Sequence, residues 1–148
     1  MTRTAMAILG HEADARDAVA DALGSVWRGL PQLRDPLAFE AWSTRILVHA
    51  CRRSLRRRGR ERVREVAIDG QAGLGVSDPA DAASGRITLE RAFDRLDADV
   101  RAILVLHHLE GRPLREIASI LGVPVGTAKS RLHTARRALE RALERESR

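Results

Sequence analysis

Apolar residues recur at spacings of three and four along much of the chain, which is the period of an α-helix that buries one face. The clearest stripe lies near the end of the chain and consists of Val125, Ala128, Leu132, Ala135, Leu139 and Leu143. Comparable stripes run through residues 13–29, 36–58, 86–96 and 97–111. Leu, Ala, Ile, Val and Arg dominate the composition and aromatic residues make up only 3%, a balance that favours helix over strand. The pattern predicts an all-α protein.

Residues 113–139 predict two helices joined by a tight turn. Pro113 suits the first position of a helix, and Gly122 suits the left-handed residue that ends one. The outer face of the second helix is polar and basic, and carries Thr127, Lys129, Ser130, Arg131, His133, Thr134, Arg136 and Arg137. This arrangement is typical of a helix-turn-helix, whose second helix fits the major groove of DNA. An ordinary helical hairpin with a solvated charged face would show the same pattern.

Two longer stripes lie in the first half of the chain. Within residues 13–29, one face carries Ala15, Ala18, Val19, Ala22, Leu23, Val26 and Trp27, and the other carries Asp14, Asp17, Asp21 and Arg28. After a proline-rich loop, Asp35 suits an N-cap and Pro36 the first position of a helix that we expect over about 36–58. Its stripe consists of Phe39, Trp42, Ile46, Ala50 and Arg53. Both stripes predict buried faces.

Charge falls into three blocks. Residues 1–64 hold 13 basic and 7 acidic residues, residues 65–99 hold 3 and 8, and residues 100–148 hold 10 and 5. Two basic blocks separated by an acidic one suggest two contacts with a polyanion, most simply nucleic acid. An Arg-rich tract at 52–60 ends the first block. A solvated charged tail would have the same composition. However, so many like charges on one helix repel one another, which favours contact with a polyanion that compensates them.

The organisation that we expect is two small helical domains joined by a linker. Residues 60–85 include a stretch rich in Gly, Asp and Ser without helical period, so they predict a flexible linker. The domains are then 1–59 and 86–148, each near the lower size limit for a core of its own. A fully extended linker reaches ~90 Å at ~3.3–3.6 Å per residue. Since DNA advances ~34 Å per turn, the two domains can touch sites two turns apart.

Several function classes lack support in the sequence. No catalytic constellation and no Gly-rich phosphate loop is present, and the adjacent His107 and His108 point about 100° apart on a helix, unlike a chelating pair. We therefore expect neither an enzyme, nor a metal site, nor a cofactor. Cys51 is the single cysteine, which excludes an intramolecular disulfide and indicates a reducing, cytoplasmic location; we expect a small buried residue there. No apolar run is long enough to span a membrane, and the N-terminus does not resemble a secretory signal.

The motifs together resemble the extracytoplasmic-function (ECF) group of bacterial sigma factors. Leu109-Glu110-Gly111, Glu116-Ile117-Ala118 and the run Gly-Thr-Ala-Lys-Ser-Arg-Leu-His at 126–133 follow the family's sigma-four domain. Asp14-Ala15-Arg16-Asp17-Ala18-Val19, Arg34-Asp35-Pro36 and the segment from Phe39 to Ile46 resemble its sigma-two domain. The resemblance implies a sigma-two-like bundle followed by a sigma-four-like helix-turn-helix domain.

The resemblance also implies roles for individual residues. At the −35 promoter element it places Thr127, Lys129, Ser130, Arg131, His133 and Arg136, of which Lys129, Ser130 and His133 would read bases and the others would hold phosphates. At the −10 strand it places Arg34, Phe39, Trp42, Arg45 and His49. Core packing is the alternative role for Phe39 and Trp42. Asp14, Asp17 and Asp21 would contact the polymerase clamp, or be solvated.

The chain departs from the family pattern at four places. Most of the helical segment that usually precedes the position of Arg3 is missing, which we expect to trim the bundle and its polymerase contact. Ala20 replaces the usual glutamine after the Asp-rich motif, His49 replaces an asparagine, and Thr134 replaces a common arginine. These changes bear on core binding and on promoter choice.

Two functions follow as hypotheses. The first is an alternative sigma factor that binds core RNA polymerase and promoter DNA, and that an anti-sigma factor holds inactive. The second is an autonomous helix-turn-helix regulator that binds duplex DNA without polymerase. The first half of the chain favours the sigma factor, because residues 13–58 resemble a docking and strand-capturing module rather than a sensor or a dimer surface.

Overall fold

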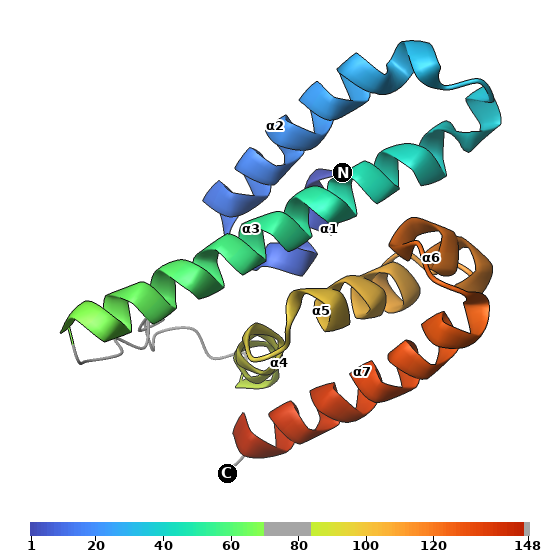
Figure 1. Ribbon diagram of the computed structural model, residues 1–148. Helices are drawn as coiled ribbons and strands as arrows, with labels where there is room; N and C mark the ends of the chain where they lie inside the picture. The colour runs from blue at the N-terminus through green and yellow to red at the C-terminus, as the bar shows by residue number, and fades with distance from the viewer. Residues whose placement is uncertain (70–83, 147–148) are drawn as a thin grey trace.

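The computed structural model describes residues 1–69 and 84–146, and all of its regular elements are helical (Figure 1). The α-helices are α1 (Thr2–Leu9), α2 (Glu12–Gly29), α3 (Phe39–Asp69), α4 (Ser84–Asp94), α5 (Ala98–Leu104), α6 (Leu114–Leu121) and α7 (Val125–Glu146). Two 3-10 turns, η1 (Leu30–Gln32) and η2 (Pro36–Ala38), join α2 to α3, and a π-helical turn, η3 (Val105–Leu109), extends α5. The predicted all-α class is confirmed.

Residues at several helix ends behave as expected. Gly10 and Gly122 follow α1 and α6 with φ of +74° and +67°, a region that favours glycine because it has no Cβ. The Asp35 carboxylate accepts a hydrogen bond from the Leu37 N–H at 2.9 Å. The Asp97 carboxylate accepts from the N–H groups of Asp99 and Val100 and caps α5. These four residues therefore separate the helices, and two of them, Gly122 and Asp35, do so where the sequence predicted.

The third helix is longer than predicted. It continues to Asp69, well past the expected end near 58, so residues 60–69 of the predicted linker are helical. Residues 84 and 85 belong to α4. The rest of the predicted linker, residues 70–83, lies outside the described residues.

In the first half, α2 packs antiparallel beside α3, and α1 packs against both (Figure 1). Ile8 and Leu9 of α1 are fully enclosed, as are Leu47 and Cys51 of α3. The predicted stripes were wrong at their edges. In α2 the large residues at the C-terminal end, Leu23 and Trp27, are exposed, whereas Ala15, Ala18, Ala22 and Val26 are buried. In α3 the buried face is offset from the predicted one and holds Ser43, Thr44, Leu47, Val48, Ala50 and Cys51.

In the second half, α7 closes one side of a bundle formed with α4, α5 and α6. Ala128, Leu132 and Ala135 of α7 are buried as predicted, and so are Ile103, Leu104 and Leu106 of the α5–η3 segment. Val125 belongs to the predicted stripe but is exposed, and so are Leu89 and Leu109 within the stripes predicted over 86–96 and 97–111. In η3 the Glu110 N–H bonds to the Val105 carbonyl, a π-type bond that shifts the register of the last turn.

The two halves pack against each other. In the ribbon, α3 lies between α2 on one side and α5 and α6 on the other, and α1 contacts α5 and η3 (Figure 1). Their buried apolar residues form one continuous cluster that reaches from Ala5 and Ile8 to Leu132 and Ala142. None of the helices within 1–69 and 84–146 is both long and apolar enough to cross a lipid bilayer.

Candidate nucleic-acid interface

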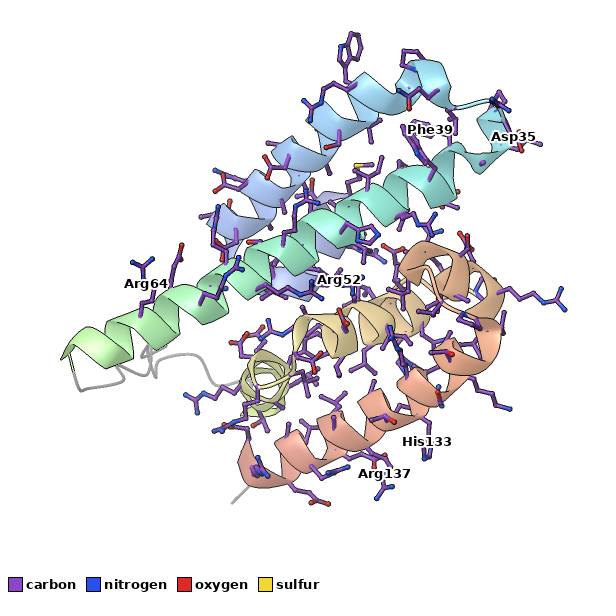
Figure 2. The ribbon with its side chains drawn as sticks, in the orientation of Figure 1. Asp35, Phe39, Arg52, Arg64, His133 and Arg137 are labelled. Atoms are coloured by element: carbon purple, nitrogen blue, oxygen red, sulfur yellow. The ribbon has the colours of Figure 1, made fainter. Side chains whose placement is uncertain are left out.

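The second helix of the helix-turn-helix presents a polar face to solvent. Because Ala128, Leu132 and Ala135 anchor α7 to the bundle, residues one or two positions away point outward. Lys129, Ser130, Arg131, His133, Thr134, Arg136 and Arg137 are all exposed, and Thr127 is half-buried. His133 and Arg137 point away from the other half of the chain (Figure 2). The structure thus brings together the six residues predicted for the −35 element on one outer face.

Arg136 is held by two histidines. Its Nε donates to Nε2 of His108 at 3.3 Å, and its Nη2 lies 3.1 Å from Nε2 of His107. Arginine can only donate, so these contacts need unprotonated Nε2 atoms. Burial lowers the pKa of His108, and the neighbouring His107 and Arg136 lower it further. The two histidines therefore position a guanidinium group beside the reading face, a role that the sequence did not suggest.

A second basic face runs along α3. Trp42, Arg45 and His49 follow one another at spacings of three and four, so they share a side of the helix. Arg53 and Arg56 continue that side and are exposed, as are Arg45 and His49. Burial lowers the pKa of His49, and so do the charges of Arg52, Arg45, Arg53 and Arg56 in that order. This electrostatic effect shows that positive charge is concentrated here.

The aromatic residues of the −10 prediction lie at the start of α3. Phe39 is half-exposed, and its ring centroid lies 6.1 Å from that of Trp42, with the planes tilted by 50°. Gly29 at the end of α2 makes room for Trp42, because a Cβ there would lie 2.8 Å from Cζ2 of the indole. The exposure of Phe39 argues against simple core packing. Leu37 beside it is 93% exposed, a feature that the apolar pattern did not indicate.

Arg34 lies in the exposed loop between η1 and η2, near this aromatic pair in the chain. Asp35 next to it orders the turn into η2 through its cap. Figure 2 shows Asp35 and Phe39 at the end of the α2–α3 hairpin. The five residues predicted for the −10 strand therefore occupy the hairpin end and the adjoining side of α3.

The outer face of α2 differs from the prediction. Asp14 is half-buried and pairs with Arg58 at 3.0 Å, whereas Asp17 and Asp21 are exposed. Leu23 and Trp27 are exposed nearby, and Trp27 shows 78% of its surface. Large exposed apolar side chains are typical of a protein-binding surface. In the sequence, the spacing of four between Leu23 and Trp27 indicated that both residues were buried, so the pattern did not reveal this exposed apolar surface.

Two observations concern a metal site and the cysteine. Among the described residues no group of three or more His, Cys, Asp or Glu side chains could hold a metal ion. Cys51 is buried as expected, and burial raises the pKa of its thiol to about 12. The thiol is therefore not a nucleophile at neutral pH. The two basic surfaces lie one on each helical half, on α3 and on α7. Together with the helix-turn-helix, they define the chain as a nucleic-acid-binding protein.

Comparisons with known proteins narrow this class to one family. The family model for sigma-70 region 2 matches residues 1–61, and that for sigma-70 region 4 matches residues 86–139. The ECF RNA polymerase sigma-E factor of Escherichia coli is 30% identical, over 88% of this chain and 74% of the relative. The chain belongs to the ECF group of RNA polymerase sigma factors.

Other relatives are longer. The ECF sigma factor SigE of Mycolicibacterium smegmatis is 33% identical over 98% of this chain. SigM of Mycobacterium tuberculosis is 35% identical over 88% of it. The chain spans 58% and 64% of the lengths of these two relatives.

A solved structure matches both halves at once. It is the sigma factor RpoE of Bartonella quintana in a complex with the anti-sigma factor NepR. The match covers 97% of this chain and 89% of that chain, with a TM-score of 0.71 and 25% sequence identity.

Proposed function

We propose that this protein is an alternative sigma factor that directs core RNA polymerase to specific promoters and helps to initiate transcription. The observation that carries the proposal is that each of its two family-matched halves exposes its own basic face, on α3 and on α7. A protein that must hold two separate promoter elements needs two such faces. The role is one of binding, with no chemical step performed by the chain.

In this proposal α7 enters the major groove at the −35 element. Lys129, Ser130 and His133, all exposed on α7, would contact base edges. Thr127, Arg131 and Arg136 would contact phosphates, which supply affinity and register rather than sequence choice. The hydrogen bonds from Arg136 to His107 and His108 support this division, because they hold the guanidinium group in place before DNA arrives.

The −10 element would be held as a single strand by the first half. Phe39 and Trp42 offer aromatic surfaces on which an opened base can stack, and the exposed Arg45 and His49 on the adjoining side of α3 would contact the backbone of the strand. Arg34 at the hairpin end would add a phosphate contact. The two contacts would lie on separate halves of the described chain, one on residues 1–69 and the other on residues 84–146.

The outer face of α2 is the surface that we assign to core polymerase. Asp17 and Asp21 supply charge, while Leu23 and Trp27 supply the apolar contact area that anchors most protein interfaces. Asp14 contributes indirectly, since it already pairs with Arg58. Because the similar RpoE structure is a complex with an anti-sigma factor, we also propose an anti-sigma partner for this chain, and a cytoplasmic location where the polymerase acts.

A reconstituted transcription assay tests the proposal. The protein is mixed with core RNA polymerase and with promoter DNA selected from a randomised library, and specific transcripts are measured. A sigma factor yields transcripts only when protein and core are both present. If the protein forms no complex with core and yet binds duplex DNA tightly by itself, it is an autonomous regulator instead.

A further inference from the structure

A pocket of about 440 Å³ lies between α3, α5 and α7. The wall from α7 carries hydroxyl groups and an arginine, α3 adds a second arginine, and the segment at the start of α5 adds carboxylates and apolar side chains. Pockets that bind small molecules have volumes of ~300–1,000 Å³ and combine an apolar wall with a few polar groups. This pocket is therefore large enough for a small organic ligand.

Thr134 of α7 lines the pocket and helps to keep it open. It stands where the sigma-four pattern commonly has an arginine. An arginine side chain is much larger than a threonine side chain, so from this position it would extend into the pocket. The pocket thus depends on a residue in which this chain departs from the family pattern.

Two arginines line the pocket from different helices, Arg56 on α3 and Arg131 on α7. The Asp99 carboxylate is paired with Arg52 at 2.6 Å and lies 3.9 Å from Arg56, so Arg52 is its stronger partner. The side chain of Arg56 is 62% exposed. Two guanidinium groups in one pocket repel each other, and an anion bound between them would remove that repulsion.

The hydroxyl groups of Ser130 and Thr134 lie on the α7 wall of the pocket, four residues apart and therefore on the same side of the helix. The Ser130 hydroxyl donates to the Thr127 carbonyl at 3.0 Å, a bond within the helix that it can exchange for a ligand. Guanidinium and hydroxyl groups are donors that proteins use to bind phosphate. This side of the pocket thus fits a phosphate group.

The α5 side of the pocket has a different chemistry. Val100 is half-buried and Ile103 is buried, and together they provide an apolar wall that suits a flat base. Asp97 caps α5 through Oδ1, which accepts from the N–H groups of Asp99 and Val100, so its second oxygen can accept from a hydroxyl group. A carboxylate that binds a ribose hydroxyl is a common element of nucleotide sites.

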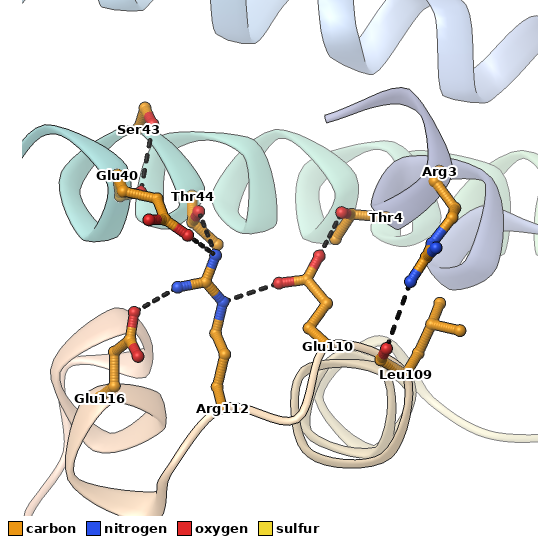
Figure 3. Close-up of polar contacts among 9 residues, drawn as sticks. All are labelled: Arg3, Thr4, Glu40, Ser43, Thr44, Leu109, Glu110, Arg112 and Glu116. Atoms are coloured by element: carbon orange, nitrogen blue, oxygen red, sulfur yellow. Dashed lines mark hydrogen bonds and ion pairs between the residues drawn. The ribbon is translucent and has the colours of Figure 1, made fainter.

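Two contacts hold α3 against the second half of the chain. Arg52 pairs with Asp99, and Arg112 donates to Glu40 and Thr44 of α3, each at 3.1 Å (Figure 3). The helices that form the pocket are therefore positioned without a ligand, as is usual for small-molecule sites.

We propose that this pocket binds a nucleoside 5′-monophosphate, with its phosphate group between Arg56 and Arg131 and its ribose beside Asp97. Ser130 and Arg131 belong to the six residues assigned to the −35 element, so the bound nucleotide and −35 DNA exclude each other. This consequence rests on the proposed function, whereas the pocket and its ligand do not. The nucleotide thereby lowers the affinity of the chain for −35 DNA.

Calorimetric titration of the full chain with the four ribonucleoside 5′-monophosphates tests the ligand. We expect saturable binding of at least one of them with one site per chain. Inorganic phosphate and the corresponding nucleoside should each bind at least tenfold more weakly, because each lacks part of the contacts. If no nucleotide binds, or if inorganic phosphate binds equally well, the proposed ligand is wrong.

Two pairs of variants test the position of the site. Arg56→Ala should weaken nucleotide binding about tenfold, because a charge-assisted hydrogen bond is lost, whereas Arg57→Ala removes the same charge from an exposed neighbouring position and should not. Thr134→Arg should abolish binding because it fills the pocket, although it adds a positive charge. Ser119→Arg adds the same charge at an exposed position of α6 and should leave binding unchanged.

Circular dichroism checks that each variant is folded, and Arg56→Ala remains informative if Thr134→Arg is not. Equal losses in Arg56→Ala and Arg57→Ala would overturn the assignment to this pocket. Tight nucleotide binding by folded Thr134→Arg would overturn it as well.

Competition with a labelled −35 duplex, measured by fluorescence anisotropy, separates the pocket from the proposed function. Nucleotide at ten times its Kd should raise the apparent Kd of the duplex about tenfold in wild-type protein and leave it unchanged in Thr134→Arg. If the nucleotide binds but does not displace the duplex, the pocket stands and the assignment of Ser130 and Arg131 to the −35 element fails. If the nucleotide binds and the chain supports no transcription with core polymerase, the pocket stands and the sigma-factor function fails.

Discussion

Replacing Lys129 by alanine tests the recognition helix most directly. Lys129 is exposed on α7, next to Ala128, whose buried side chain is untouched by the change. The free energy of unfolding should therefore change by less than about 0.5 kcal/mol, as for most surface substitutions. Any larger effect on DNA binding then comes from a lost contact with DNA.

The size of that effect depends on what Lys129 touches. A bidentate contact to a base is worth ~1–3 kcal/mol of discrimination, which corresponds to about 5- to 150-fold in affinity. We expect this loss for duplexes that carry the preferred −35 sequence and little change for scrambled duplexes. A phosphate contact would instead weaken all sequences alike and would lower the salt slope by ~0.9.

Fluorescence anisotropy with a panel of labelled duplexes provides the measurement, repeated at several salt concentrations. The matched control is Arg141→Ala, which removes one positive charge from an exposed position of the same helix, about 18 Å further along at ~1.5 Å per residue. A uniform loss across all duplexes, or an equal loss in Arg141→Ala, would show that Lys129 does not read bases.

Three further predictions follow from other sites. Trp27→Ala should weaken binding to core polymerase by about thirtyfold or more, because exposed aromatic anchors dominate interfaces. Leu37→Ala, at an even more exposed residue, should leave the affinity unchanged, and both affinities can be measured on surface-immobilised core. The pKa of His49, lowered by burial and neighbouring arginines, should rise when a −10 single strand neutralises those arginines. Affinity should therefore grow as pH falls through the pKa of the bound histidine, and an NMR titration of free and bound protein that shows no rise would contradict this. Cys51 should react with a thiol reagent roughly a thousandfold more slowly in native protein than in guanidinium, since its thiol pKa is about 12 instead of 9, and fast native reaction would show that α1 and α3 open readily.

Local features of the helices could be predicted from the sequence with good accuracy. The positions of Gly10, Gly122, Asp35 and Asp97 depend on backbone conformation and on nearby hydrogen bonds, and these involve only neighbouring residues. The reading face of α7 was predictable for the same reason, since its buried side is narrow and regular.

Burial at the edges of the stripes could not be predicted in this way. Trp27 continues the apolar side of α2, but periodicity does not reveal how far the neighbouring helices extend over it. The buried face of α3 is offset for the same reason: α1, α5 and α6 also pack on this helix, and the buried Thr44 accepts a hydrogen bond from Arg112 of the other half. The predicted end of α3 near residue 58 was wrong, because the helix continues through Gly59 and the arginines around it to Asp69.

The sequence by itself determined the helical class, the helix-turn-helix and the family, because these follow from short-range periodicity, caps and a motif confined to one helix. Only the tertiary structure decided that Arg112 of one half lies against Glu40 and Thr44 of the other, and that Arg45 meets the turn at Gly122. Such contacts join residues about seventy positions apart in the chain, and they depend on how two separately folded faces come together, which no local pattern specifies.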